Sequence, residues 1–262
     1  MKTRIISAFI ALLIVIPVFY FGGFAYRLGV GILTVIGYTE FLMAREKVKK
    51  IPPLVKIVGY SSLFTLFAMN VLNKATFSIN YKEIIFILIV FLIPVIFYQD
   101  EKKYNTSDAL TLIGGTLFLS VGFSILYTLR ESGMETLIYL FAITITTDTF
   151  AYFTGVLFGK HKMIPAISPN KSWEGALGGT LFGVAIPTIY YLTYLNPDQN
   201  VFVVILMTLF LVIISQFGDL IFSAMKRHAG VKDFSNIMPG HGGVLDRLDS
   251  LILVMLAYML II

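Results

Sequence analysis

Acidic and basic side chains gather near the C-terminus of a chain that is otherwise strongly apolar. Three of the acids, Asp219, Asp246 and Asp249, offer carboxylate oxygens, which are the ligands that Mg²⁺ prefers, and phosphate oxygens can complete such a coordination shell. Lys226 and Arg227 can neutralise phosphate charge, which arginine often does through two parallel hydrogen bonds. The stretch thus offers ligands for a metal ion and cations for phosphate, and it has no activated nucleophile. This combination fits phosphoryl or nucleotidyl transfer, in which catalysis depends on positioning and electrostatics.

The spacing of these residues predicts how helices and a turn would present them. Lys226 and Arg227 follow Asp219 by seven and eight positions, which places all three on roughly one face of a helix. The two later acids are three residues apart and share a face at the start of the next predicted helix, where acids complement the helix dipole. Between these groups, residues 239–243 (PGHGG) contain too much glycine for a helix interior and predict a tight turn with exposed N–H groups.

A second polar segment, residues 146–175, carries Asp148 near the middle of an apolar run. A carboxylate is costly there unless it faces water, a charged partner or a metal ion. Gly155 and Gly159 lie near the same side of the predicted helix, and small residues there allow another helix to pack closely. Three residues separate these glycines, where a phosphate-binding P-loop needs four and a preceding strand, so the segment does not match that motif. A proline-broken loop with further polar side chains follows.

Composition indicates the environment of these segments. Hydrophobic residues make up 57% of the 262-residue chain and charged residues 13%, about half the ~25% of ordinary soluble domains, and the mean hydropathy is +0.85. One core could not hide this much apolar surface from water, so we predict an all-α polytopic integral membrane protein. The chain has no cysteine, which excludes disulfides, thiolate metal ligands and a cysteine nucleophile. Nine stretches are candidate membrane spans: residues 5–22, 28–44, 54–72, 84–98, 109–129, 137–158, 175–195, 201–222 and 248–262.

The basic residues predict the orientation of these spans. If nine spans start from a cytoplasmic N-terminus, sixteen of the 20 Lys and Arg residues fall on the cytoplasmic side, together with the unusual polar sequence. This asymmetry predicts an outside C-terminus, because Lys and Arg in short loops set orientation. It also accounts for the net charge of +5, since no aromatic-interleaved basic strand or Cys/His metal spacing indicates a nucleic-acid partner. We expect one helical membrane domain, 1–262, with N-terminal spans in 1–135 and a catalytic part in 136–262.

The polar stretch from Ser223 to Asp249 closely resembles the hallmark of phosphatidate cytidylyltransferases, also called CDP-diacylglycerol synthases. That hallmark has the pattern S-x-x-K-R-x4-K-D, a short spacer, and then H-G-G-x-x-D-R-x-D. The upstream run from D-T-F-A-Y-F-T-G to S-P-N-K-S-W-E-G resembles the second block of the family, with Ser172 where Thr is about as common. The fixed polar positions of the hallmark are filled by Ser223, Lys226, Arg227, Lys232, Asp233, His241, Gly242, Gly243, Asp246, Arg247 and Asp249.

The resemblance implies that CTP and phosphatidate react to give CDP-diacylglycerol and pyrophosphate, with Mg²⁺ as the cofactor. Asp219 and Asp246 would bind the catalytic Mg²⁺, and an extension of this hypothesis adds Asp249 and a second cation. The expected catalytic residues are Asp219, Asp246, Lys226, Arg227, Lys232, Asp233, His241, Arg247 and Asp249. The expected substrate-binding residues are Asp148, Lys160, Ser168, Asn170, Lys171, Glu174, Ser223, Gly242 and Gly243.

Structural roles compete with these functional ones. Asp148 could be the partner of a lysine within the membrane domain. Asp219 and Asp246 could form ion pairs with basic residues at helix ends, and His241 could serve as a structural or capping residue. The basic cluster at residues 45–56 fits a topology signal that also attracts anionic lipid. Trp173 fits an interfacial anchor, and helix packing is the favoured role of Gly175, Gly178, Gly179 and Gly183.

Rival functions remain open at this point. A secondary transporter would use Asp148 and Asp219 as coupling-ion sites, but the polar residues gather on one side and no paired half-repeats are evident. A CTP-dependent polyprenol or phytol kinase has a similar membrane architecture and would release CDP in place of pyrophosphate. The expected partners are CTP, phosphatidate and the lipid bilayer, and a homodimer is favoured. A short chain without added soluble regions suits a bacterial inner membrane, with the active site facing the cytoplasm.

Overall fold

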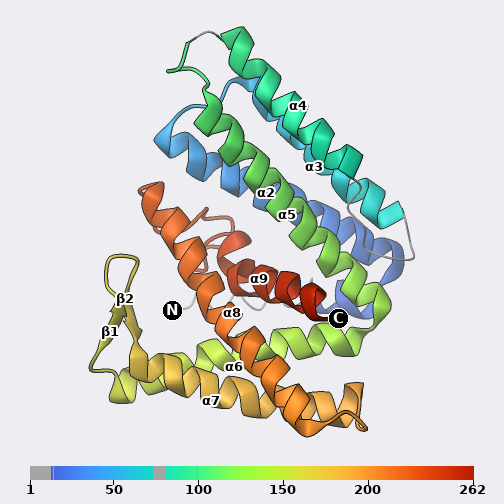
Figure 1. Cartoon of the computed structure of the whole chain (residues 1–262), viewed down its shortest axis with the longest axis vertical. Coiled ribbons are helices and arrows are strands. Elements are labelled where there is room, and N and C mark those ends of the chain that lie inside the picture. The colour runs from blue at the N-terminus through green and yellow to red at the C-terminus, as the bar shows by residue number, and fades with distance from the viewer. Residues whose placement is uncertain (1–12, 14, 73–80, 99) are drawn as a thin grey trace. The chain divides into compact units, whose positions relative to one another are not determined.

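The computed structural model describes residues 13–262 apart from residues 14, 73–80 and 99 (Figure 1). The described chain forms two compact units. One holds the described residues up to Glu131 together with Ala229–Arg247, and the other holds Ser132–His228 and Leu248–Ile262. Each unit is therefore assembled from segments that are far apart in the sequence. The expected division at residue 135, between N-terminal spans and a catalytic part, concerns function and stays a prediction.

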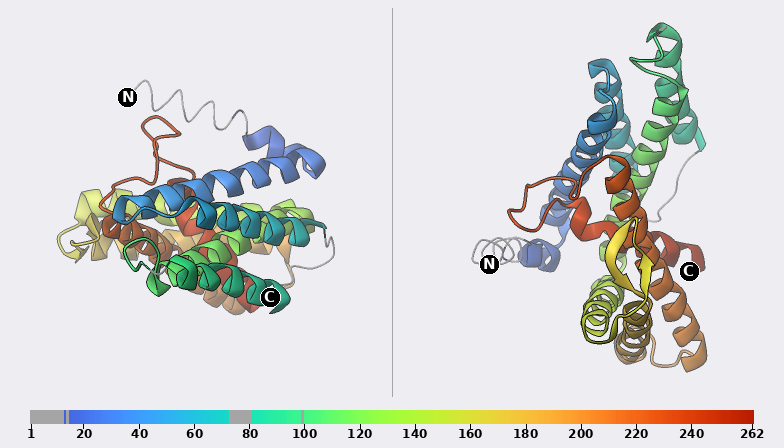
Figure 2. Two further views of the ribbon diagram at one scale, coloured as in Figure 1. Left: turned by 90° about the horizontal axis from the view of Figure 1, so that it is seen from above. Right: turned by 90° about the vertical axis from the view of Figure 1, so that its left-hand side faces the viewer.

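Four long apolar helices make up most of the first unit (Figures 1 and 2): α2 (Gly23–Val48), α3 (Pro53–Leu72), α4 (Tyr81–Tyr98) and α5 (Thr106–Ser132). Pro53 begins α3, where its fixed φ suits the first turn and its missing N–H costs nothing. Tyr26 and Tyr38 of α2 are fully buried against α5. Their hydroxyls bond to Leu126 O at 2.7 Å and to Thr116 Oγ1 at 3.0 Å. Because buried hydroxyls need partners, these bonds fix the register of α2 on α5.

The second unit contains a short hairpin among its helices: α6 (Met134–Phe158), β1 (Lys162–Ile164), β2 (Ser168–Ser172), α7 (Trp173–Tyr190), the π-helical turn η1 (Tyr191–Leu195), α8 (Val201–His228) and most of α9 (Leu245–Ile261). The two strands are antiparallel, and Lys162 pairs with Ser172. Ser172 also caps α7, since its Oγ accepts a hydrogen bond from the Gly175 N–H at 3.2 Å. The segment expected to be a loop is therefore a hairpin that leads directly into a capped helix.

Small residues let α6 and α7 pack with their backbones in close contact, side by side in Figure 2. A Cβ added to Gly179 would lie 2.7 Å from Thr147 O and 2.8 Å from Ala151 Cβ. A Cβ added to Gly178 would lie 2.3 Å from Thr154 Oγ1. These distances are too short for a real Cβ atom. The two helices can pack this closely because glycine occupies these positions of α7. The predicted packing role of the α7 glycines is confirmed.

Replacing Gly179 by Ala should destabilise the protein, although the same change usually stabilises a helix. Alanine in place of glycine normally contributes about 0.5–1 kcal/mol in a helix interior. At this position the added methyl must push α6 away, and overpacking typically costs about 1–3 kcal/mol. Gly114→Ala is the matched control, because a Cβ at Gly114 in α5 meets nothing within 4 Å. We expect the unfolding temperature in detergent to fall for Gly179→Ala and to stay level or rise for Gly114→Ala; two shifts of the same sign would contradict the packing argument.

Among the described residues, seven helices are long and apolar enough to cross a membrane: α2 to α6, α7 continued by η1, and α8. They coincide with the second to eighth predicted spans, which confirms an all-α polytopic membrane protein. The ninth predicted span corresponds to α9, whose 17 residues are fewer than the ~20 that a straight crossing needs. Half of the first predicted span, residues 5–22, lies outside the described residues. The number nine and the orientation of the two termini stay predictions.

Candidate functional site

A cavity of about 500 Å³ opens in the second unit, where the β1–β2 hairpin meets α6, α7 and α8. Lys171 on β2 and Asp219 on α8 form an ion pair there, with 2.6 Å between Nζ and Oδ2. Asp148 of α6 and Asn170 of β2 line the same cavity. Three segments that are distant in the sequence therefore bring four of the predicted site residues into one place.

Three acids and two lysines interact electrostatically around Asp219. Asp148 and Asp249 each interact electrostatically with Asp219. Lys171 acts on Asp148 from the cavity side, and Lys226, only 8% exposed, acts on Asp249. Two lysines therefore lie beside three acids, and the like charges of the acids repel one another. A bound cation would relieve that repulsion, so the electrostatics of this cluster fit a metal ion.

Contacts near the C-terminal end of α8 hold the hairpin against the acids. The Ser223 hydroxyl donates to Asp219 Oδ1 at 3.3 Å. The Arg227 Nε–H donates to the carbonyl of Ile167, in the turn of the hairpin, at 3.3 Å. Ser168 follows that turn and is half-buried at the start of β2. Arg227 therefore positions the hairpin in this structure, while the predicted contacts of Arg227 and Ser168 with substrate stay predictions.

Glu174 closes the base of the hairpin. Its Oε1 lies 2.6 Å from Nδ1 of His161, and the His161 N–H donates to both carboxylate oxygens at 3.2 Å. The Trp173 N–H donates in turn to His161 O at 2.9 Å. Lys160 is exposed next to this base. His161 therefore has a positioning role in this structure, and the predicted substrate contacts of Glu174 and Lys160 stay predictions.

The glycine-rich turn before α9 belongs to the first unit and forms as predicted. Gly240 and Gly242 have φ angles of +80° and +82°, a region that favours glycine. The His241 N–H donates to Met238 O at 2.8 Å, and the Met238 N–H donates to Gly242 O at 3.0 Å. Arg247 Nε donates to His241 O at 2.8 Å and so clamps the turn from the first turn of α9.

Asp246 organises the segment on both sides of this turn. Its Oδ2 accepts hydrogen bonds from the N–H groups of Phe234 at 2.8 Å and Gly243 at 2.9 Å. A Cβ at Gly242 would lie 2.8 Å from the same oxygen, so this carboxylate needs a glycine beside it. One oxygen of Asp246 thus has a clear role in shaping the backbone, and the substrate-binding role of Gly242 and Gly243 stays a prediction.

Glu40 on α2 is a residue that the sequence argument missed. Its side chain is fully buried, with 0% of the residue exposed. Oε1 accepts hydrogen bonds from the Val244 N–H at 2.9 Å and the Ser235 hydroxyl at 2.6 Å, and Oε2 accepts one from the Leu245 N–H at 2.8 Å. A Cβ at Gly243 would lie 2.3 Å from Oε1. A carboxylate from α2 therefore caps the start of α9 and requires a glycine next to the turn.

The signal for Glu40 was present in the sequence. Like Asp148, it is an acid inside a predicted membrane span, and such an acid needs a partner because its burial is costly. The identity of the partner was not available from spacing, since the bonded backbone groups lie 204 and 205 residues further along the chain.

In the part of the chain that the structure describes, no three Asp, Glu or His residues are grouped so that they alone could hold a metal ion. The donor type still fits Mg²⁺, which is commonly bound through one or two carboxylates together with substrate phosphates and water. Asp219 belongs to the second unit and Asp246 to the first, so the idea that they share one ion stays a prediction. Lys232 and Asp233 are exposed in the segment before the turn, and their roles also stay predictions.

Comparison with known proteins covers almost the whole chain. The sequence profile described as the cytidylyltransferase family matches residues 2–262. The chain belongs to this family. A phosphatidate cytidylyltransferase of Staphylococcus haemolyticus (strain JCSC1435) is 33% identical over 261 residues, which cover 97% of this chain and 96% of that protein. Proteins of the same name from Staphylococcus aureus (strain COL) and Staphylococcus epidermidis (strain ATCC 12228) are 34% identical over 256 and 259 residues, with the same coverage.

Membership in the cytidylyltransferase family agrees with the two polar segments and extends beyond them. The hallmark residues lie in the C-terminal part of the chain, whereas the family match includes α2 to α5 as well. Together with the seven apolar helices, this similarity identifies an integral membrane enzyme of the cytidylyltransferase family.

Proposed function

We propose that this protein is a phosphatidate cytidylyltransferase, which transfers CMP from CTP to the phosphate of phosphatidate and releases pyrophosphate. The observation that carries the proposal is the similarity to proteins of that name over 97% of the chain. The cavity with its Lys171–Asp219 ion pair supports it, because acids and cations side by side suit a reaction between phosphate groups.

In this reaction a phosphate oxygen of phosphatidate attacks the α-phosphorus of CTP. A new P–O bond forms while the bond from the α-phosphorus to the oxygen that bridges to the β-phosphorus breaks, and pyrophosphate leaves with that bridging oxygen. The lipid phosphate is already ionised and needs little help from a base, so the main barrier is the approach of two polyanions. We assign the offsetting positive charge to Lys171, Lys226, Arg227, Lys232 and Arg247.

Mg²⁺ is the proposed cofactor, and when bound it would supply positive charge that polarises phosphate oxygens. We assign Asp219 and Asp246 as its ligands, with Asp249 available to a second cation. The mutual repulsion among Asp148, Asp219 and Asp249 supports cation binding in the second unit. On the side of the first unit, Glu40 fixes the backbone that carries Asp246 into α9.

We also propose that the site faces the cytoplasm at the edge of a bacterial plasma membrane and that the protein forms a homodimer. The concentration of Lys and Arg in alternate loops supports this orientation. The bacterial origin of the relatives supports the membrane assignment. Cysteine-accessibility labelling at introduced positions tests the orientation, since the natural chain has no cysteine. Cross-linking in native membranes tests the dimer.

An assay with purified protein tests the activity. Detergent-solubilised protein with radiolabelled CTP, phosphatidate and Mg²⁺ should form a labelled lipid and an equal amount of pyrophosphate, and chelation of Mg²⁺ should stop both. No ion gradient exists in detergent, so a secondary transporter would give no product. A CTP-dependent lipid kinase would release CDP and leave the lipid without the cytosine label. Either of these two results would overturn the proposal.

Replacing Lys171 by Met should lower kcat/KM by about 100-fold. The change removes the cation that pairs with Asp219 and that we assign to phosphate, while the Met side chain keeps a similar length. Lys47→Met is the matched control, because Lys47 is an exposed lysine near the end of α2 in the other unit. Initial rates at several CTP concentrations measure the effect. Equal activity in the two variants would exclude the assigned role of Lys171.

A further inference from the structure

A second large cavity lies in the first unit, and none of the residues assigned to catalysis lines it. It has a volume of about 800 Å³ and is formed by the α2–α3 and α4–α5 connections with the adjoining helix ends. One wall is apolar and contains Ile51, the two prolines that follow it, and Tyr98. The rest of the lining is mostly basic and consists of Glu46, Lys50, Lys56, Lys102 and Lys103.

The neighbouring acids do not neutralise this lining. Glu46 is paired with Lys56, at 2.5 Å between Oε1 and Nζ. Within the described parts of the chain, no carboxylate lies at ion-pair distance from Lys50, Lys102 or Lys103. Three ammonium groups from two different connections therefore face one cavity without an anionic partner of their own.

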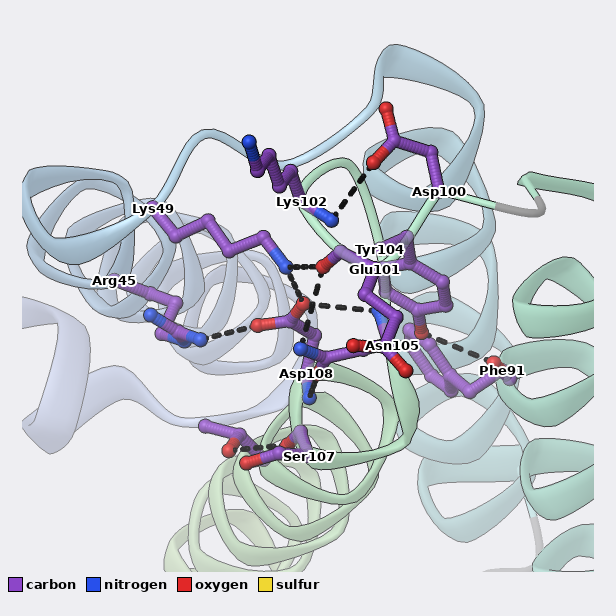
Figure 3. A network of polar contacts seen from close by, with 11 residues as sticks. Arg45, Lys49, Phe91, Asp100, Glu101, Lys102, Tyr104, Asn105, Ser107 and Asp108 are labelled. Carbon is purple, nitrogen blue, oxygen red and sulfur yellow. Dashed lines mark hydrogen bonds and ion pairs between the residues drawn. The ribbon is translucent and has the colours of Figure 1, made fainter.

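Asp108 at the start of α5 is already paired with two cations (Figure 3). Its carboxylate binds Arg45 through Oδ1 and Lys49 through Oδ2, the latter at 2.5 Å. Asp108 and Asn105 also exchange hydrogen bonds between side chain and backbone, at 3.0 and 2.9 Å, which caps the start of α5. Figure 3 shows the Lys102 ammonium directed away from this network. The network occupies Arg45 and Lys49, and the lysines that line the cavity have no ion pair with Asp108.

The two connections that present the lysines are held in place. Lys49 Nζ donates to Glu101 O at 2.7 Å and so ties the end of α2 to the α4–α5 connection. Tyr104, 2% exposed, donates to Phe91 O at 3.0 Å and anchors the same connection on α4. A ligand would therefore meet lysines on an ordered scaffold, which lowers the entropy cost of binding.

The position of the cavity indicates what kind of anion it takes. It lies at the ends of four apolar helices, where the hydrocarbon region of a membrane gives way to headgroups. Basic pockets between membrane helices at this level bind the headgroups of anionic lipids. The lysines can bind a phosphate group, whether it belongs to a lipid headgroup or to free phosphate. The apolar wall favours a ligand that also carries acyl chains.

We propose that this cavity binds the headgroup of an anionic phospholipid from the surrounding bilayer. None of its lining residues is assigned to the proposed catalytic centre, and the proposal does not depend on that assignment. Lysines that served only as a topology signal would contribute to insertion and would show no saturable preference among lipids in the folded protein.

Native mass spectrometry of the detergent-purified protein tests the proposal, with phosphatidylglycerol as the probe because it takes no part in the proposed reaction. Wild-type protein should bind phosphatidylglycerol saturably and in preference to phosphatidylcholine. The variant Lys102→Gln/Lys103→Gln should bind it roughly 30-fold more weakly, since each lysine near a lipid surface contributes a factor of about five. Lys47→Gln/Lys82→Gln removes the same charge elsewhere and should bind like wild type.

Two further arms make the result decisive. Lys50→Gln, on the other connection, should weaken binding about fivefold by itself and replaces the double variant if that protein does not fold. Inorganic phosphate should fail to displace bound phosphatidylglycerol. Displacement by inorganic phosphate would reassign the cavity to a free anion, and equal lipid binding by all variants would remove the site altogether; each outcome overturns the proposal. Loss of lipid binding with CDP-diacylglycerol synthesis retained would show that this site and the catalytic proposal stand separately.

Discussion

Asp246→Asn should reduce CDP-diacylglycerol formation by about 10³-fold or more while the protein still inserts and folds. Asparagine keeps a carbonyl oxygen that can accept the N–H groups of Phe234 and Gly243, so the backbone around the turn should persist. The substitution removes the carboxylate charge of Asp246, which we assign as a ligand of Mg²⁺. Preorganised charge at the reacting phosphates is among the largest contributions to catalysis.

Product formation over time measures this loss, and the unfolding temperature in detergent verifies the fold. Asp198→Asn is a suitable control, because Asp198 is an exposed acid in the connection between η1 and α8. We expect that control to retain wild-type turnover. Turnover of the Asp246→Asn enzyme within about tenfold of wild type would exclude a direct part for this carboxylate in the reaction.

Glu40→Ala should have the second largest effect, and here both stability and activity should fall. The change leaves the N–H groups of Val244 and Leu245 and the hydroxyl of Ser235 without their acceptor. Each buried donor left unsatisfied costs about 1–3 kcal/mol, so the loss should amount to several kcal/mol. Activity should fall with it, because the start of α9 and therefore Asp246 would lose their support.

Glu40→Gln separates positioning from general destabilisation. Glutamine keeps one carbonyl acceptor but turns its amide N–H groups toward a backbone donor, so one of the bonds at the start of α9 must be lost. We expect an intermediate unfolding temperature and a reduced kcat, with KM for CTP nearly unchanged, if Glu40 acts by orienting the turn. Glu46→Gln, six residues along α2 and outside this contact, is the matched control. Full activity in Glu40→Gln would contradict the positioning role.

The periodicity and composition of the sequence predict the helices well, because crossing a bilayer imposes a length and an apolar surface that are visible locally. The second to eighth predicted spans appear as helices, and the glycines of α7 pack against α6 as expected. The turn before α9 could also be predicted, since left-handed backbone at Gly240 and Gly242 is a local property of glycine.

Contacts between distant segments could not be predicted with the same success. Asp148, Asn170 and Lys171 gather with Asp219 because a hairpin forms where the prolines indicated an irregular loop. The sequence near Glu40 gives no indication of its hydrogen bond with Val244, because the donor is a backbone N–H group of a kind that almost every residue has. The sequence shows which buried polar side chains need hydrogen-bond partners. The tertiary fold determines which atoms become those partners.

The bond between α2 and the start of α9 has a consequence for biogenesis. A ribosome delivers α2 to the membrane long before the groups that Glu40 binds have been synthesised, and the whole of α3 to α8 must follow first. During that interval the acid lacks the backbone donors that it binds in the folded protein, and lipid supplies none in their place. Maturation of this unit should therefore be a late event, completed only after Leu245 has been synthesised.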